Sequence, residues 1–139
     1  MIVLDTNVVS ELLRTEPASE VLDWLRGQSS ASLFITTVTH AEIRYGIAIL
    51  PAGKRRDALD ALANEILGED FAGQTLTFDA AAAEYFATIA ADRRALGKPI
   101  SQFDAQIAAI TRSRGANLAT RNVRDFVDCG VTLINPWDA

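Results

Sequence analysis

Cysteine, histidine, lysine and long hydrophobic runs are all scarce in this sequence, and each shortage argues against a class of protein. One cysteine and one histidine among 139 residues cannot supply an intramolecular disulfide or the usual kind of zinc cluster. Thiol chemistry, zinc chemistry and a serine–histidine triad are therefore disfavoured. The lone histidine, His40, stands beside the start of an expected helix. At such a position histidine is more often structural than a general base.

No stretch of the chain is long enough and apolar enough to span a membrane. The longest apolar runs, such as residues 47–50 and 80–83, are only four residues long, and no charged-then-apolar signal segment opens the sequence. Hydrophobic residues make up 49% and charged residues 22%, which is typical of a folded globular protein. We therefore expect one cytoplasmic domain over residues 1–139, with no membrane association.

The charge pattern argues against a broad basic surface for nucleic acid, because the formal net charge is −5. A nuclease remains compatible with that charge, since carboxylates around divalent cations add negative charge that the metal offsets. Arginine outnumbers lysine eleven to two, and its fork suits phosphate. We interpret Arg55–Arg56 and Arg93–Arg94 as solvated helix faces. Arg121 and Arg124 fit solvent or a phosphate equally well.

Short apolar segments alternate with helical patterns along the whole chain. Strands are predicted over residues 2–4, 33–35, 76–78, 117–119 and 131–134, and helices over 8–13, 17–27, 41–47, 52–67, 80–96 and 104–114. This alternation predicts an α/β domain in which a mostly parallel sheet is covered by helices on both faces. In such sheets, ligands bind beyond the carboxyl ends of the strands, where the strand order reverses.

Three acidic residues lie at or near the predicted starts of helices. Asp5 comes directly after the first strand, Glu42 lies early in the helix after the second, and Asp104 opens the sixth helix. A turn of Thr120, Arg121 and Asn122 follows the penultimate strand. Parallel strands would bring Asp5, Glu42 and this turn to one edge of the sheet. Their oxygens would then suit Mg²⁺ or Mn²⁺.

Each acid also has a structural interpretation. Thr39 with Glu42, and Ser101 with Asp104, have the spacing of a capping box, and Asp5 can cap the helix that follows it. Negative charge at a helix N-terminus is favourable by about 0.3 to 1 kcal/mol in any case. Capping alone gives no reason for three helix starts to meet at one site.

Four segments together resemble the PIN-domain nucleases. They are MIVLDTN at 1–7, THAEIRYG at 39–46, SQFDAQIAA at 101–109 and LATRNVRDF at 118–126, and they occur in the family's order over nearly the whole chain. The closing NPWDA is similar to the VapC and FitB type of toxin within that family. The resemblance implies a PIN-like three-layer α/β/α fold with a mostly parallel sheet.

The resemblance also implies a Mg²⁺-dependent endoribonuclease, with Mn²⁺ able to substitute. The metal ligands of the family match Asp5, Glu42 and Asp104, with a fourth catalytic position at the TRN turn. Family members often have aspartate there, whereas this chain has Asn122, with Asp125 three residues later. The fourth ligand is therefore left open between Asn122 and Asp125.

Further positions and partners follow from the same resemblance. Asn7, Thr120, Arg121 and Asp125 are candidates for supporting the ligands or contacting RNA, with the Thr120 hydroxyl suited to orient a carboxylate or a water. One or two cations would polarise a phosphodiester and help to generate hydroxide. The expected partners are RNA, a cognate VapB- or FitA-like antitoxin that inserts a basic side chain, and a second copy of this chain.

Two rival functions remain. One is a phosphatase with Asp5 as its nucleophile, because such enzymes also have an aspartate directly after the first strand. Their motif is DxDx[TV], and in this chain Asn7 stands where the second aspartate should be. The other is a PIN-like binding module that has lost its activity. The presence of Asp5, Glu42 and Asp104 argues against it, whereas asparagine at position 122 in place of an acid argues for it. The sequence carries no aromatic and basic signature that would identify an RNA target.

Overall fold

The centre of the molecule is a parallel sheet of five short strands. The computed structural model describes all 139 residues and gives the strand order β3-β2-β1-β4-β5. The strands are β1 (Ile2–Leu4), β2 (Leu33–Thr36), β3 (Thr75–Leu76), β4 (Asn117–Ala119) and β5 (Leu133–Ile134), and every neighbouring pair is parallel. The strand order reverses beside β1, so Asp5 and Thr120 lie at the switch point.

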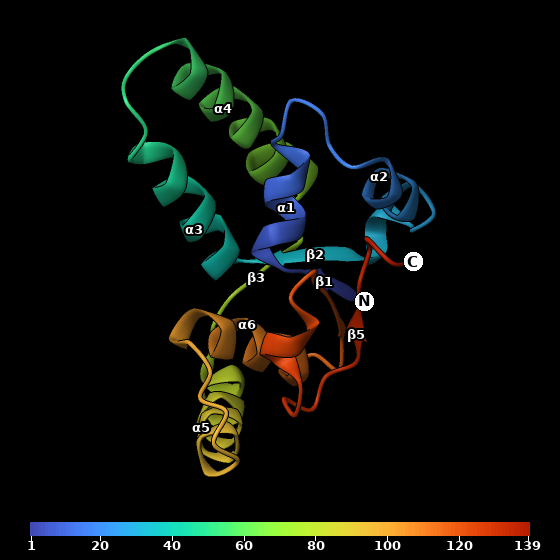
Figure 1. The fold of residues 1–139 in the computed structure, drawn as a ribbon, viewed down its shortest axis with the longest axis vertical. Coiled ribbons are helices and arrows are strands. Elements are labelled where there is room, and N and C mark those ends of the chain that lie inside the picture. Colours follow the sequence, from blue (N-terminus) through green and yellow to red (C-terminus); the bar gives the residue numbers. More distant parts are fainter.

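Helices cover both faces of the sheet, which confirms the predicted three-layer fold. Four helices lie above the sheet in Figure 1, namely α1 (Thr6–Leu12), α2 (Ser19–Arg26), α3 (Thr37–Ala48) and α4 (Lys54–Glu65). Below it lie α5 (Ala80–Ala95) and α6 (Gln102–Ser113), which pack against each other. None of these helices combines the length and apolarity that crossing a membrane requires.

Successive strand residues face opposite cores, as the two-residue repeat of a strand requires. Val3 and Leu118 are fully buried in the cluster with α5 and α6. Their neighbours Leu4 and Ala119 are fully buried in the cluster with α1, α3 and α4. The strands are therefore buried on both sides, which explains why they appear in the sequence as apolar runs without alternation.

Five of the six helix starts differ from the predicted boundaries, and two of these, in α3 and α6, concern the acidic residues. α3 begins at Thr37, because the Thr36 hydroxyl caps it by accepting from the Thr39 amide at 3.1 Å. Thr39 therefore lies inside the helix, and the predicted capping box with Glu42 is wrong. α6 begins at Gln102, and Ser101 accepts from the Asp104 amide at 3.2 Å, as the spacing predicted.

Elsewhere in the chain the structure differs from the predicted elements in smaller ways. α4 continues into a π-helical turn, Ile66–Asp70, and 3₁₀ turns occur at Ser30–Ser32 and Val123–Phe126. The strand predicted over 76–78 lies instead at Thr75–Leu76, and the one predicted over 131–134 shortens to Leu133–Ile134.

Arg93 corrects the expectation that Arg93 and Arg94 are both solvated. Arg94 is exposed, whereas only 5% of Arg93 is accessible. The Arg93 guanidinium donates to the carbonyls of Lys98 at 2.7 Å, Asp125 at 2.7 Å and Val127 at 2.9 Å. It therefore ties the end of α5 to the loop after β4. A helix-face pattern cannot reveal this contact, because the acceptors are backbone atoms 32 and 34 residues away.

We predict that Arg93→Met lowers the free energy of unfolding by about 2 to 4 kcal/mol, since buried carbonyls lose a charged donor. Arg94→Met is the matched control and should change it by about 0.5 kcal/mol or less. Urea unfolding of the three proteins measures both values. Equal losses in the two variants would show that the buried contacts add nothing to stability.

Candidate active site

Asp5 is the most constrained acid of the site. It follows β1, caps α1, and only 4% of it is accessible. Its Oδ1 accepts from the Thr6 amide at 2.8 Å, and its Oδ2 accepts from the Thr120 hydroxyl at 2.8 Å and the Asn7 side-chain amide at 3.2 Å. These donors come from the ends of two adjacent strands, so they fix the carboxylate at the switch point of the sheet.

Glu42 is joined to the same site through threonines. It lies in α3, and its Oε1 accepts from the Thr6 hydroxyl at 2.8 Å. That hydroxyl also lies 3.0 Å from the Thr39 hydroxyl, which links α1 to α3. The Glu42 side chain is partly buried, and its other oxygen makes no hydrogen bond within the protein. One oxygen is thus held in place while the other is available to a ligand.

A pocket of about 470 Å³ brings the predicted acids together. Asp104, the third residue of α6, reaches it from the layer opposite to α1 and α3. The residues that line the pocket are Asp5, Thr6, Asn7, Ser10, Glu11, Arg14, Glu42, Asp104, Arg121, Asn122 and Trp137. The structure therefore places Asp5, Glu42, Asp104, Asn7, Arg121 and Asn122 around one space.

Of the two candidates for the fourth position, Asn122 lines the pocket and Asp125 does not. Asn122 lines the pocket, and its amide donates to the Thr120 hydroxyl at 3.0 Å. Asp125 lies one turn further, in the 3₁₀ segment, and is exposed and outside the pocket lining. Its backbone carbonyl accepts from Arg93 instead. Thr120 is buried behind Asp5 and orients it, which is the supporting geometry that its position suggested.

The pocket is electrostatically unfavourable for its own acids. Burial, with smaller contributions from the charges of Asp104 and Glu42, raises the pKa of Asp5 from 3.8 to about 6, while hydrogen bonds from Thr120 and Thr6 act to lower it. Burial also raises the pKa of Asp104, with a smaller contribution from Asp125. None of Asp5, Glu42 and Asp104 takes part in a salt bridge. The acids therefore form no ion pair within the protein, although the charge of Arg93 partly offsets the rise in the pKa of Asp104.

The donor set fits a hard divalent cation, although the carboxylates are not gathered into a finished cage. No three histidine, cysteine or acidic side chains converge tightly enough to enclose a metal by themselves. Mg²⁺ does not require such a cage, because it usually keeps several waters and takes one or two carboxylates. Asp5 and Asp104, with the free oxygen of Glu42 and the Asn122 amide, offer oxygen donors of that kind.

Several residues that hold or line the site were not among the predicted site residues. Glu11 is almost fully buried, and its carboxylate accepts from the Ala18 amide at 2.8 Å, so it holds the loop after α1. Thr6 lies beside Asp5 in the segment MIVLDTN, but its residue type alone did not predict its contact with Glu42. Trp137 comes from the last residues of the chain. Only the folded chain brings this indole to the acids.

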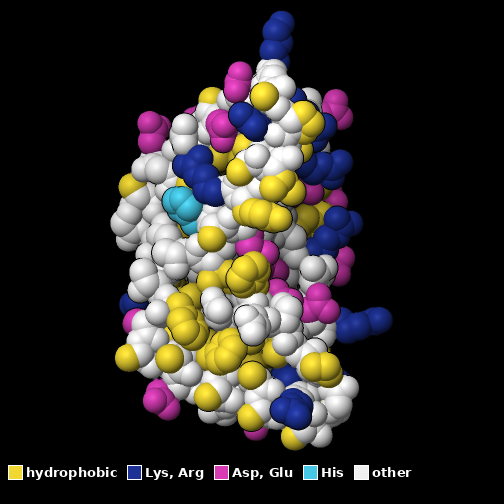
Figure 2. Space-filling view, turned by 90° about the vertical axis from the view of Figure 1, so that its left-hand side faces the viewer, with side chains coloured by type: hydrophobic (Ala, Val, Ile, Leu, Met, Phe, Trp, Pro, Cys, Tyr) yellow, Lys and Arg dark blue, Asp and Glu magenta, His cyan; other side chains and the backbone are white.

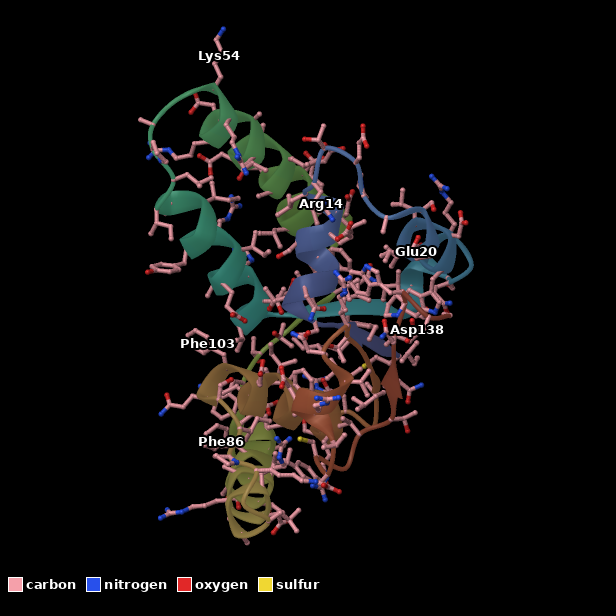
Figure 3. The ribbon with its side chains drawn as sticks, in the orientation of Figure 1. Arg14, Glu20, Lys54, Phe86, Phe103 and Asp138 are labelled. Carbon is pink, nitrogen blue, oxygen red and sulfur yellow. The ribbon has the colours of Figure 1, made fainter.

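A larger groove of about 1180 Å³ adjoins the acidic pocket. It runs between α1, α3 and α4, and its apolar lining includes Leu13, Ile43, Ile47, Leu50, Leu59 and Leu62. Thr6, Ser10, Arg14 and Glu42 line both spaces, so the groove opens directly onto the acids. Figure 3 shows Arg14 near the end of α1, at this junction.

We predict that Asp5→Asn changes the pH dependence of stability in metal-free, chelator-treated protein. The pKa of Asp5 is higher in the folded protein, at about 6, than the 3.8 of a free carboxyl. The contribution of Asp5 to the free energy of unfolding is therefore full below about pH 4 and is lost as the pH rises through about 6. The stability of Asp5→Asn relative to wild type should rise by up to about 3 kcal/mol from pH 4 to pH 7.

Chemical unfolding across this pH range measures the difference. Asp92→Asn, at an exposed aspartate of α5, is the control, and its profile should run parallel to that of wild type. A parallel profile for Asp5→Asn as well would contradict the burial of an uncompensated charge.

Comparisons with known proteins identify the family to which the sequence and the fold belong. The PIN domain family matches residues 2–129. The chain is 42% identical over 139 residues to "VapC ribonuclease Y4jK" of Sinorhizobium fredii, covering 99% of both chains. It is 36% identical over 137 residues to "Toxin FitB" of Neisseria gonorrhoeae, again covering 99% of both.

A solved structure extends the match to three dimensions. The chain superposes on one from "Structure of FitAB bound to IR36 DNA fragment" with a TM-score of 0.92 and 36% identity, covering 99% of this chain and 96% of that one. The relatives thus share both the sequence and the fold over almost their full length. This chain is therefore a member of the PIN-domain family, and its relatives there include VapC and FitB proteins.

Proposed function

We propose that this chain is an endoribonuclease that hydrolyses RNA phosphodiester bonds with Mg²⁺, or Mn²⁺ in its place, and acts as the toxin of a toxin–antitoxin pair. The observation that carries the proposal is one pocket in which Asp5, Glu42 and Asp104 have no cationic partner in the protein. The names of the relatives, a VapC ribonuclease and the toxin FitB, support the RNA substrate and the toxin role.

Asp5 and Asp104 are the residues we assign to hold the cation. Asp5 is fixed by Thr120, Thr6 and Asn7, so it offers its carboxylate without a loss of side-chain freedom. Asp104 approaches from the start of α6, where its amide is already held by Ser101. A bound divalent cation would polarise the phosphodiester and lower the pKa of an attacking water.

Glu42 is suited to handle the attacking water. Thr6 fixes one of its oxygens, and the second has no partner in the protein. A carboxylate in this state can accept a proton from a water placed between Glu42 and the phosphodiester. Asn122 offers an amide oxygen at the fourth position, without charge, so it would hold a cation more weakly than the aspartate frequent in the family.

The groove beside the acids supports the partner assignment. A helical or extended segment with apolar side chains could fill the groove between α1, α3 and α4, while a basic residue reaches Glu42 at its junction with the pocket. An antitoxin of the VapB or FitA type, which the relatives' assemblies suggest, fits this description. A bound arginine or lysine would supply the positive charge that the acids lack.

A second apolar surface supports a homodimer. Large hydrophobic side chains are exposed on α3 and directly after it, on α6, and around the start of α5, namely Tyr45, Ile49, Phe103, Phe78 and Tyr85. Figure 2 shows hydrophobic side chains gathered on the side of the molecule that lies to the left in Figure 1, and Figure 3 labels Phe103 on that side. Contact with a second copy would cover this surface from water.

We predict that Asp104→Asn abolishes RNA cleavage, by about 100-fold or more, because it removes a ligand charge at nearly constant shape. In wild type, cleavage should require Mg²⁺ and stop with a chelator, and Mg²⁺ should raise the unfolding temperature. In Asp104→Asn that rise should be much smaller.

The matched control is Asp92→Asn, which keeps full cleavage and the full response to Mg²⁺. Wild-type cleavage by Asp104→Asn with intact folding would refute the ligand assignment. Wild-type protein that cleaves no RNA with any divalent cation would instead favour an inactive binding module.

The fourth position gives a separate prediction. Asn122→Ala should lower activity and raise the Mg²⁺ concentration for half-maximal cleavage, because it removes an oxygen donor at the pocket. Asp125→Ala should have a smaller effect, since Asp125 lies outside the pocket and acts on Asp104 through its charge. Magnesium titrations of both variants decide between them. Loss of cleavage in a folded Asp125→Ala protein, with Asn122→Ala unaffected, would place the fourth ligand on Asp125.

A further inference from the structure

One wall of the acidic pocket is formed by an arginine stacked on a tryptophan. The guanidinium carbon of Arg121 lies 5.0 Å from the centre of the Trp137 ring, and both residues line the pocket that holds Asp5, Glu42 and Asp104. Trp137 is the one hydrophobic residue in that lining. A lone indole in a polar pocket, covered by a cation, calls for an explanation beyond core packing.

The N–H groups of the Arg121 guanidinium are available to a ligand, because they take part in no hydrogen bond or salt bridge within the protein. Stacking uses the flat face of a guanidinium, whereas its N–H groups lie in the plane and point outwards. Arg121 is exposed and makes no salt bridge, although four acidic residues line the same pocket. Its backbone amide donates to the Asn7 side chain at 3.3 Å, which holds the residue beside Asp5. The edge is therefore free for a bidentate contact with an anion.

Trp137 is held in place by a hydrogen-bonded turn and by packing against the core. Its amide donates to the Asn135 side chain at 3.0 Å, and the Asp138 amide donates to the Asn135 carbonyl at 3.1 Å. The indole packs against the core cluster that contains Leu4 and Ala119. This turn presents a fixed platform to Arg121, so little side-chain freedom is lost when Arg121 binds a ligand.

Arg14, the other arginine that lines the pocket, is already paired with an acid. Arg14 lies 3.4 Å from both carboxylate oxygens of the buried Glu11, so much of its charge is already offset. Arg121 is then the cation of the pocket that has no acidic partner. A nucleic acid strand that brings one phosphate to Asp5 and Asp104 carries further phosphates on either side, which need a cation in an otherwise acidic setting.

We propose that Arg121, stacked on Trp137, binds the phosphate of the RNA nucleotide next to the scissile phosphodiester. This inference rests on the proposed ribonuclease function. The contact is to the backbone and not to a base, so it positions the strand without selecting its sequence. It raises affinity equally for the bound substrate and the transition state, and therefore acts on KM more than on kcat.

Binding of a short fluorescein-labelled single-stranded RNA, followed by anisotropy over a range of salt concentrations, tests the proposal. Arg121→Ala should weaken binding about tenfold and reduce the slope of log affinity against log salt by about 1. Arg121→Lys should keep the salt slope but lose part of the affinity, because it lacks the flat fork. Trp137→Leu should weaken binding less than Arg121→Ala and leave the salt slope unchanged.

Arg124→Ala is the matched control, since Arg124 is exposed, lies three residues along the chain and does not line the pocket. It should change affinity by about twofold or less. Equal effects of Arg121→Ala and Arg124→Ala would overturn the proposal, because only general charge would then matter. If Trp137→Leu fails to fold, the three arginine variants still decide the question.

Cleavage kinetics separate this inference from the proposed function. Arg121→Ala should raise KM about tenfold with kcat nearly unchanged. Metal-dependent cleavage by wild type together with unchanged RNA binding in Arg121→Ala would refute the phosphate contact alone. Absence of cleavage with RNA binding that still depends on Arg121 would refute the nuclease alone, and a wild type that neither cleaves nor binds RNA would refute both.

Discussion

A carboxylate buried without a cation is the constraint on which the site depends. Asp5 is almost inaccessible to water, and burial raises its pKa to about 6. Three donors hold it in place, but none of them carries a positive charge. A chain that needed only a helix cap at this position could use a neutral side chain at lower cost. The proposed cation would compensate this charge, and it would then tie the stability of the fold to the chemistry of the site.

The parallel sheet explains how distant residues reach this pocket. The strand order reverses beside β1, so the segments after β1 and β4 meet there, and α3 brings Glu42 from the end of β2. α6 adds Asp104 from the opposite helix layer. Arg93 fixes the loop after β4 from below, through the carbonyls of Asp125 and Val127. Each layer of the fold thus contributes one wall of the site.

The sequence predicted the parts of this arrangement that depend on local patterns. An apolar run before Asp5 indicated a buried strand and its carboxyl end, and Ser101 before Asp104 indicated a helix start. The position of Arg93 was predicted wrongly, because its partners are backbone carbonyls that no pattern of residue types marks. The stack of Arg121 on Trp137 joins segments whose proximity only the sheet creates. The sequence therefore could not predict long-range contacts, whether from a side chain to backbone carbonyls or between two loops.

Crystals of the protein soaked with Mn²⁺ and measured at its absorption edge give the most direct test of the central claim. An anomalous peak within about 2.5 Å of carboxylate oxygens of Asp5 and Asp104 is predicted, with Glu42 and Asn122 around it. The same peak should vanish in Asp104→Asn crystals. Full Mn²⁺ occupancy elsewhere on the molecule, with no peak in the pocket, would contradict a cation site built from these acids.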